Sequence, residues 1–257
     1  MNPFDIPAGV LVPALGVALT FLLAGFVKGM VGLGLPTVAM GLLGLFMSPV
    51  QAASLLIVPS LVTNVQQMLT GGTLAKLVRR LWPLQLAAVA GTLWAPVSLA
   101  TLDTKIASAG LGGALMIYAV LGLGAIQIAV SEAAQRWASP LVGLITGVIT
   151  AATGVFVFPA APYLQGLGLN KEELVQALGL SFTVSTAALA CRLALDGTLI
   201  YGAASSAWNL IVPLLVALLG MAVGQMLRGK LSETRFKRVF FSGLLLVGLH
   251  LLLKGLL

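Results

Sequence analysis

The sequence predicts an all-α polytopic membrane protein made of two inverted-topology repeats, each with a broken, re-entrant helical hairpin. The first observation behind this prediction is composition. Hydrophobic residues make up 59% of the 257-residue chain and charged residues only 8%, and the mean hydropathy is +1.08. One soluble core cannot bury that many apolar side chains without also covering the protein surface with them. The second observation is a repeated interruption of the apolar pattern, and the third is the placement of positive charge.

Apolar segments suited to crossing about 30 Å of hydrocarbon recur along the whole chain. They lie at about 8–27, 33–47, 49–70, 77–100, 104–130, 138–153, 156–168, 172–195, 202–227 and 236–256. Two of them, 33–47 and 156–168, are too short to be comfortable full spans. Each short segment follows a run that is interrupted by Gly or Pro, so we expect about eight main helical segments, two of them broken. The chain 1–257 is then a single transmembrane domain.

The same interrupted segment occurs twice. The first copy runs from Gly25 to Pro36 and reads GFVKGMVGLGLP, and the second runs from Gly147 to Pro159 and reads GVITAATGVFVFP. Paired interruptions at matching places in the two halves of a membrane protein are typical of the binding site of a transporter. This motif therefore says more about function than any other feature of the chain.

The two halves share a register beyond the interruption. Glycines and helix-capping residues recur at one constant spacing, with Gly25, Gly32, Gly44 and Ser48 matching Gly147, Gly154, Gly166 and Asn170. Ser48 and Asn170 are good N-caps, so the next helix of each half should begin directly after them. We therefore assign the internal repeats to about 8–130 and 138–257. The alternative is a chance match, because Gly and Pro are frequent in transmembrane helices.

Positive charge decides whether each short segment continues forward or doubles back, because Lys and Arg accumulate in cytoplasmic loops. The two strongest basic loops lie at 76–80 and 228–238. Straight crossings would place them on opposite faces of the membrane, which contradicts the rule. If both broken segments double back, these loops, Arg136 and Lys171 all face the cytoplasm. Each half then makes an odd number of passes, so the repeats are inverted and both termini are periplasmic or extracellular.

Lys28 is the most informative single residue, because it stands among apolar residues just before the first interruption. A lysine at the bilayer centre costs about 2.5 to 3.5 kcal/mol on insertion scales, so it should face a partner or a hydrated cavity. No acidic residue lies in a matching span to neutralise it, which favours an anionic substrate as the partner. The alternative is a topology charge that reaches the cytoplasmic surface.

The residues around both interruptions form the candidate substrate site. A helix that begins after a break presents free N–H donors and about half a positive charge, which suits an oxyanion. Pro36 and Pro159 suit the first turn of such a helix, and the glycines permit either close ligand approach or close helix packing. The candidate substrate-binding residues are Lys28, Gly29, Gly32, Gly34, Pro36, Thr153, Gly154 and Pro159.

Polar side chains at helical spacing follow each hairpin. The candidate pathway-lining residues are Ser60, Asn64, Gln67, Ser181, Ser185 and Arg192. Such a stripe lines a solvated path or hydrogen-bonds neighbouring helices, and the second role is the commoner one for Ser and Thr. Arg192 has a further alternative, because Asp196 follows it by one helical turn and suits an ion pair.

The motif from Gly25 to Pro36, its counterpart from Gly154 to Pro159 and the short all-membrane chain together resemble the TauE/SafE sulfite exporter family over nearly the whole length. The resemblance implies movement of sulfite, sulfoacetate, related organosulfonates or other small sulfur-containing anions across the bacterial inner (plasma) membrane. The second motif departs from the glycine-rich form at Phe156 and Phe158, which bears on the width and symmetry of that half of the site.

Three classes of function compete for these observations. A secondary transporter, in the export direction, accounts for the inverted repeat, the broken helices and Lys28. An anion channel or a transporter of another small anion, such as a carboxylate, is the alternative. An enzyme is not expected, because one His, one Cys and no acid inside a span other than Asp196 at an end supply neither a metal site nor a catalytic set. We expect no cofactor, no metal and no nucleic-acid partner, only a small anion and the lipid bilayer.

Overall fold

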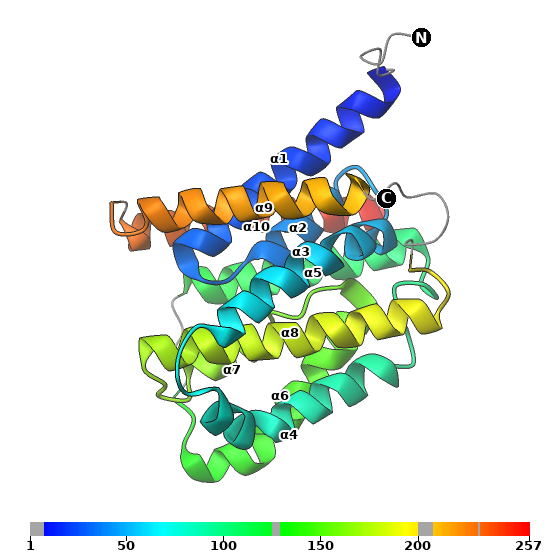
Figure 1. Ribbon diagram of the computed structural model, residues 1–257. Helices are drawn as coiled ribbons and strands as arrows, with labels where there is room; N and C mark the ends of the chain where they lie inside the picture. Colours follow the sequence, from blue (N-terminus) through cyan, green and yellow to red (C-terminus); the bar gives the residue numbers. More distant parts are fainter. Residues whose placement is uncertain (1–7, 125–128, 200–207, 231) are drawn as a thin grey trace.

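The computed structural model describes residues 8–124, 129–199, 208–230 and 232–257, and in these ranges it contains ten α-helices and no strand (Figure 1). The helices are α1 (Ala8–Val31), α2 (Leu35–Leu43), α3 (Pro49–Leu69), α4 (Leu74–Leu93), α5 (Thr104–Leu123), α6 (Glu132–Thr153), α7 (Ala160–Gln165), α8 (Lys171–Leu195), α9 (Trp208–Leu227) and α10 (Glu233–Leu256). The predicted all-helical class is confirmed. Counting α1 with α2 and α6 with α7 as two broken helices gives the predicted eight main segments.

Some helix ends differ from the apolar segments in the sequence. α6 begins at Glu132, six residues before the predicted apolar run, because the Ser131 side chain accepts a hydrogen bond from the Ala134 N–H and caps a polar first turn. α5 ends at Leu123, where Gly124 is its C-cap. A prediction from hydropathy alone misses a polar first turn at the start of a helix. It also extends an apolar segment past a glycine at which the helix ends.

Among the described helices, six are long and apolar enough to cross a membrane, namely α1, α3, α5, α8, α9 and α10. Large apolar side chains point outward from several of them, such as Leu19 at 64% exposure in α1 and Leu219 at 60% in α9. In water such faces would cost free energy, whereas lipid tails solvate them. The chain is a multi-pass membrane protein.

The first interruption, residues 32–34, is followed by a hairpin. α2 leads away from the break, and α3 returns to it after the Ser48 N-cap, where Ser48 and Gln51 form a reciprocal capping box. The return is fixed by Gln67 near the end of α3, whose Nε2 donates to the Gly32 carbonyl at 2.8 Å. The short segment therefore doubles back and does not continue α1.

The second interruption, residues 154–159, has the same course. α7 leads from the break back toward the beginning of α6, because the Val130 N–H donates to the Gly166 carbonyl at 2.9 Å. Asn170 then caps α8 through a capping box with Glu173. Both N-caps predicted from the sequence, Ser48 and Asn170, are confirmed as the starts of α3 and α8.

The long helices associate in pairs: α1 with α9, α4 with α6, α5 with α10, and α3 with α8. Glycines bring the backbones together, because a Cβ on Gly25 would collide with the Ala217 carbonyl of α9 and one on Gly147 with the Ala88 carbonyl of α4. In the predicted register α1 matches α6 and α9 matches α4. Gly25 and Gly147, which the sequence predicts to be equivalent, each make the close backbone contact of their own helix pair.

Contacts between helix ends form two separate groups. At one end, drawn on the left of Figure 1, the beginnings of α4 and α8 meet, with Lys76 and Glu173 paired at 2.8 Å. At the other end, on the right of Figure 1, Lys254 of α10 donates to the Leu45 carbonyl and Lys105 of α5 to the Leu257 carbonyl. The loop at 76–80 and Lys171, both predicted to face the cytoplasm, lie at the first end, and the end of the chain at Leu257, predicted to lie outside, lies at the second.

Candidate functional site

A cavity of about 460 Å³ lies inside the helix assembly and borders both interruptions. Val31 and Leu33 line it from the first break, and Phe158 and Pro159 line it from the second. The breaks are more than 120 residues apart in the sequence, yet they share this one space. The fold therefore brings the two repeated motifs to a common site.

Three basic side chains line the same cavity: Lys171 at the start of α8, Arg228 directly after α9, and Lys237 in α10. Lys171 and Arg228 are exposed and Lys237 is half-buried, so they lie at the mouth of the cavity. The described residues that line the cavity include no carboxylate. A cavity with cations at the mouth and no acid among these residues attracts anions.

Deeper in the cavity, aromatic and aliphatic side chains form the wall. Tyr118 of α5 and Phe241 of α10 meet edge to face with ring centroids 5.3 Å apart. Tyr163 of α7 is fixed by a hydrogen bond between its hydroxyl and the Ser139 hydroxyl of α6. With Phe158, these rings give the cavity a rigid apolar interior behind the basic mouth.

Lys28 lies one helical turn before the first break and is 4% exposed, so it does not reach the protein surface. Its amine donates to the Asn64 side-chain oxygen of α3, and no carboxylate pairs with it in the part of the chain that the structure describes. Lys28 does not line the cavity, whereas Val31 on the next turn does. A buried amine thus lies one helical turn before the cavity-lining Val31.

Asn64 continues the polar contacts into the interior. Its Nδ2 donates to the Ser60 hydroxyl at 3.0 Å, and Ser60 in turn lies 3.2 Å from the Thr186 hydroxyl of α8. These side chains are buried, so the chain of hydrogen bonds joins α1, α3 and α8 across the middle of the protein. Two of the candidate pathway residues, Ser60 and Asn64, are accordingly engaged with protein groups.

The first break is shaped by two glycines with positive φ. Gly32 has φ +81° and Gly34 has φ +112°, a region that L-residues seldom adopt. Gly34 is the N-cap of α2 and offers no side chain to the N–H groups of the first turn, where Pro36 removes one donor. Gln67 holds the break by donating both to the Gly32 carbonyl and to the Val175 carbonyl of α8.

The second break differs from the first. Gly154, with φ +71°, ends α6, and the Thr153 hydroxyl before it accepts from the Val155 N–H at 3.2 Å. Pro159 precedes the first turn of α7, which begins at Ala160. α7 has only six residues. Its dipole is correspondingly small. Phe158 lines the cavity, whereas Phe156 packs against Phe182 with ring centroids 5.6 Å apart.

The remaining candidate residues lie away from the breaks or are held by neighbours. Gly29 packs against the Met221 carbonyl of α9, which is the helix-packing role. The Ser181 hydroxyl accepts from Gln85 of α4 at 2.7 Å, and Ser185 is buried in α8. Arg192 pairs with Asp196 at 3.1 Å and donates to the Leu93 and Ala95 carbonyls at the end of α4.

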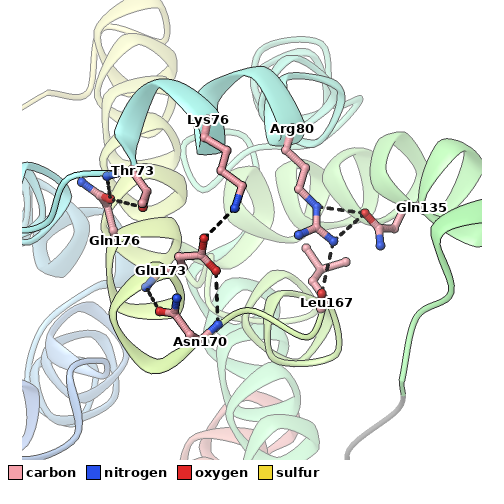
Figure 2. Close-up of polar contacts among 8 residues, drawn as sticks. All are labelled: Thr73, Lys76, Arg80, Gln135, Leu167, Asn170, Glu173 and Gln176. Atoms are coloured by element: carbon pink, nitrogen blue, oxygen red, sulfur yellow. Dashed lines mark hydrogen bonds and ion pairs between the residues drawn. The ribbon is translucent and has the colours of Figure 1, made fainter.

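Figure 2 shows a polar cluster that joins the beginning of α4 to α6, to the loop before α8 and to α8 itself. Lys76 pairs with Glu173, and Gln176 accepts from both the backbone N–H and the hydroxyl of Thr73. Arg80 donates to Gln135 and to the Leu167 carbonyl. Sequence reasoning missed these contacts, since no local pattern pairs residues that lie 55 to 103 positions apart.

A helical membrane protein in which two interrupted helices and a group of cations share one internal cavity has the construction of a transporter. Residues 17–251 match the family described as Sulfite exporter TauE/SafE, which is nearly the whole chain, so the protein belongs to this family. The family comprises membrane transporters and not enzymes, as the sequence predicted. No individual curated protein and no solved structure matches the chain.

Proposed function

We propose that the protein is a secondary transporter that exports small sulfur-containing anions, such as sulfite, sulfoacetate or other organosulfonates, across the inner membrane. The observation that carries the proposal is the cavity that borders both interruptions and has Lys171, Arg228 and Lys237 at its mouth. Membership of the sulfite exporter family supports a sulfur-containing anion as cargo. The basic mouth explains why an anion would enter.

In this proposal the first break contributes more binding interactions than the second. α2 is nine residues long, and no side chain caps its first turn, so its N–H groups and its dipole are directed toward the break. Lys28 adds a buried amine one helical turn before the break. Pro159 and Phe158 contribute shape from the second break, since the six-residue α7 adds little dipole. The two halves thus play different roles in one site.

We further propose that the repeats are inverted and that the basic mouth faces the cytoplasm. Matching helix pairs and the two groups of helix-end contacts support this topology. A cytoplasmic mouth lets the cavity load from inside the cell. An interior-negative membrane potential then favours outward movement of an anion by about 2.3 kcal/mol per charge per 100 mV, which drives export without a second ion.

Both termini should lie outside the cytoplasm. Alkaline phosphatase fused after Leu257 should be active, because the enzyme matures only in the periplasm, and green fluorescent protein at the same position should stay dark. A fusion within the loop at Arg228 to Lys230 gives the matched control and should show the reverse pattern. An inactive phosphatase with a fluorescent protein at Leu257 would contradict the inverted repeat.

A panel of anions tests the proposed cargo. Sulfite, sulfoacetate, a short alkanesulfonate and matched carboxylates should be compared for thermal stabilisation of the purified protein. A ligand at a hundred times its Kd stabilises the folded state by about 2.7 kcal/mol, so the cargo should raise the melting temperature in a saturable way. Stabilisation by carboxylates and not by sulfur anions would reassign the cargo, and stabilisation by none would contradict anion binding.

A further inference from the structure

The cavity is far larger than a small sulfur oxyanion. A water molecule in the liquid takes about 30 Å³, whereas the cavity holds about 460 Å³, a volume typical of sites for much larger organic ligands. Sulfite has four heavy atoms and would occupy only a small part of this space. An anion with a larger organic body fits the volume of the cavity better than sulfite does.

The polar groups are also unevenly placed. The cations Lys171 and Arg228 are exposed at the mouth, whereas Tyr118, Phe158 and Phe241 line the interior. A bare oxyanion at the mouth would leave this apolar wall uncovered, and one among the aromatic rings would exchange part of its hydration for apolar surface. A cavity that is basic at its mouth and apolar inside suits a ligand with an anionic end and an apolar end.

We infer that the cavity selects amphiphilic anions, in which a charged head pairs with Lys171 and Arg228 and a hydrocarbon body of several carbons covers Phe158, Tyr118 and Phe241. This inference rests on the proposed anion transport and adds that the hydrocarbon body, and not the oxyanion alone, sets the affinity. Burial of one methylene is worth about fourfold in affinity when complete. A longer body is therefore favoured until the interior is full.

Two kinds of molecule have this combination of an anionic head and an apolar body: a soluble organic anion, and an anionic lipid from the surrounding membrane. We assign the cavity to the soluble anion, because its cationic side chains Lys171 and Arg228 are exposed at the start of α8 and directly after α9, where an anion in solution reaches them.

The test is a homologous series. Methane-, propane- and hexanesulfonate are titrated calorimetrically into the protein held in phosphatidylcholine nanodiscs. We expect affinity to rise at least about twofold per methylene, or about thirtyfold across the series, with an increasingly negative heat-capacity change as apolar surface is buried. A second set of nanodiscs of phosphatidylglycerol tests the lipid source. Loss of hexanesulfonate binding there would assign the cavity to lipid and overturn the inference.

Two pairs of variants locate the ligand. Arg228→Gln should weaken the whole series about equally, whereas Arg79→Gln, an exposed charge that does not line the cavity, should leave it unchanged. Val142→Phe fills the cavity and should abolish the gain with chain length, whereas Leu141→Phe at a neighbouring exposed position should preserve it. The first pair of variants tests where the charged head binds, and the second pair tests where the hydrocarbon body binds.

The outcomes distinguish this inference from the proposed function. Equal affinity for methane- and hexanesulfonate, with sulfite bound, would overturn the selection of amphiphiles and leave sulfur-anion transport standing. A chain-length gain that Val142→Phe does not reduce would place the body outside the cavity and overturn the inference as well. Binding of no anion at all would overturn both.

Discussion

Replacing Lys28 with Met should weaken anion binding at least tenfold while changing the melting temperature of the ligand-free protein little. A unit charge about 10 Å from a bound anion contributes roughly 1.7 kcal/mol at an effective dielectric constant of 20, and tenfold corresponds to about 1.4 kcal/mol. The Lys28 amine supplies this charge when it is protonated, and it is buried one helical turn before the cavity-lining Val31. Calorimetry measures the anion affinity, and a fluorescence melting curve measures the melting temperature of the ligand-free protein.

The small effect on stability follows from two opposing terms. Removing a charge from the bilayer relieves about 2.5 to 3.5 kcal/mol, whereas leaving the Asn64 oxygen without its donor costs about 1 to 3 kcal/mol. Lys28→Arg retains the charge and should recover part of the binding, and Lys28→Ala should behave like Lys28→Met toward anions. Unchanged anion affinity in well-folded Lys28→Met would leave Lys28 with a purely structural role.

Gly32→Val and Gly154→Val should each lower the affinity for the same anion at least about tenfold, because each reshapes one side of the shared cavity. Gly32 has φ +81°, which a β-branched residue resists, so Val31 and Leu33 must shift. Gly154 has φ +71°, and a Cβ there would lie 2.8 Å from the Met40 methyl of α2. Ligand-dependent stabilisation of monodisperse protein measures both.

Gly197 supplies the matched control. It too has a positive φ, +67°, but it is exposed after α8 and a Cβ there would meet nothing within 4 Å. Gly197→Val therefore reports backbone strain alone and should bind anions like the wild type. Normal binding by Gly154→Val together with loss in Gly32→Val would confine the site to the first repeat, in keeping with the short α7 and with Phe156 and Phe158.

The sequence predicted most of the fold because membrane helices have strong local signals. Apolar length located every helix in the described residues, and Ser48 and Asn170 marked the starts of α3 and α8. The positive-inside rule favoured the doubling back that Gln67 now fixes through Gly32. These signals work because a lipid environment forces backbone hydrogen bonds to be satisfied within helices.

The site was less predictable, because it depends on contacts between distant segments. Lys171, Arg228 and Lys237 were interpreted as topology charges, and only the packing of α8, α9 and α10 places them at one cavity. The same holds for Asn64, which the pathway stripe included without indicating its bond to Lys28. Periodicity shows which residues share a helix face, but it does not show which helix lies opposite.

Anion efflux from proteoliposomes tests the transport proposal most directly. Liposomes loaded with labelled sulfoacetate and given an interior-negative potential should show efflux that saturates with substrate, scales with the potential and is lost in Gly32→Val. Efflux no faster than from protein-free liposomes would contradict transport. A large passive flux that rises without saturation would instead identify a channel.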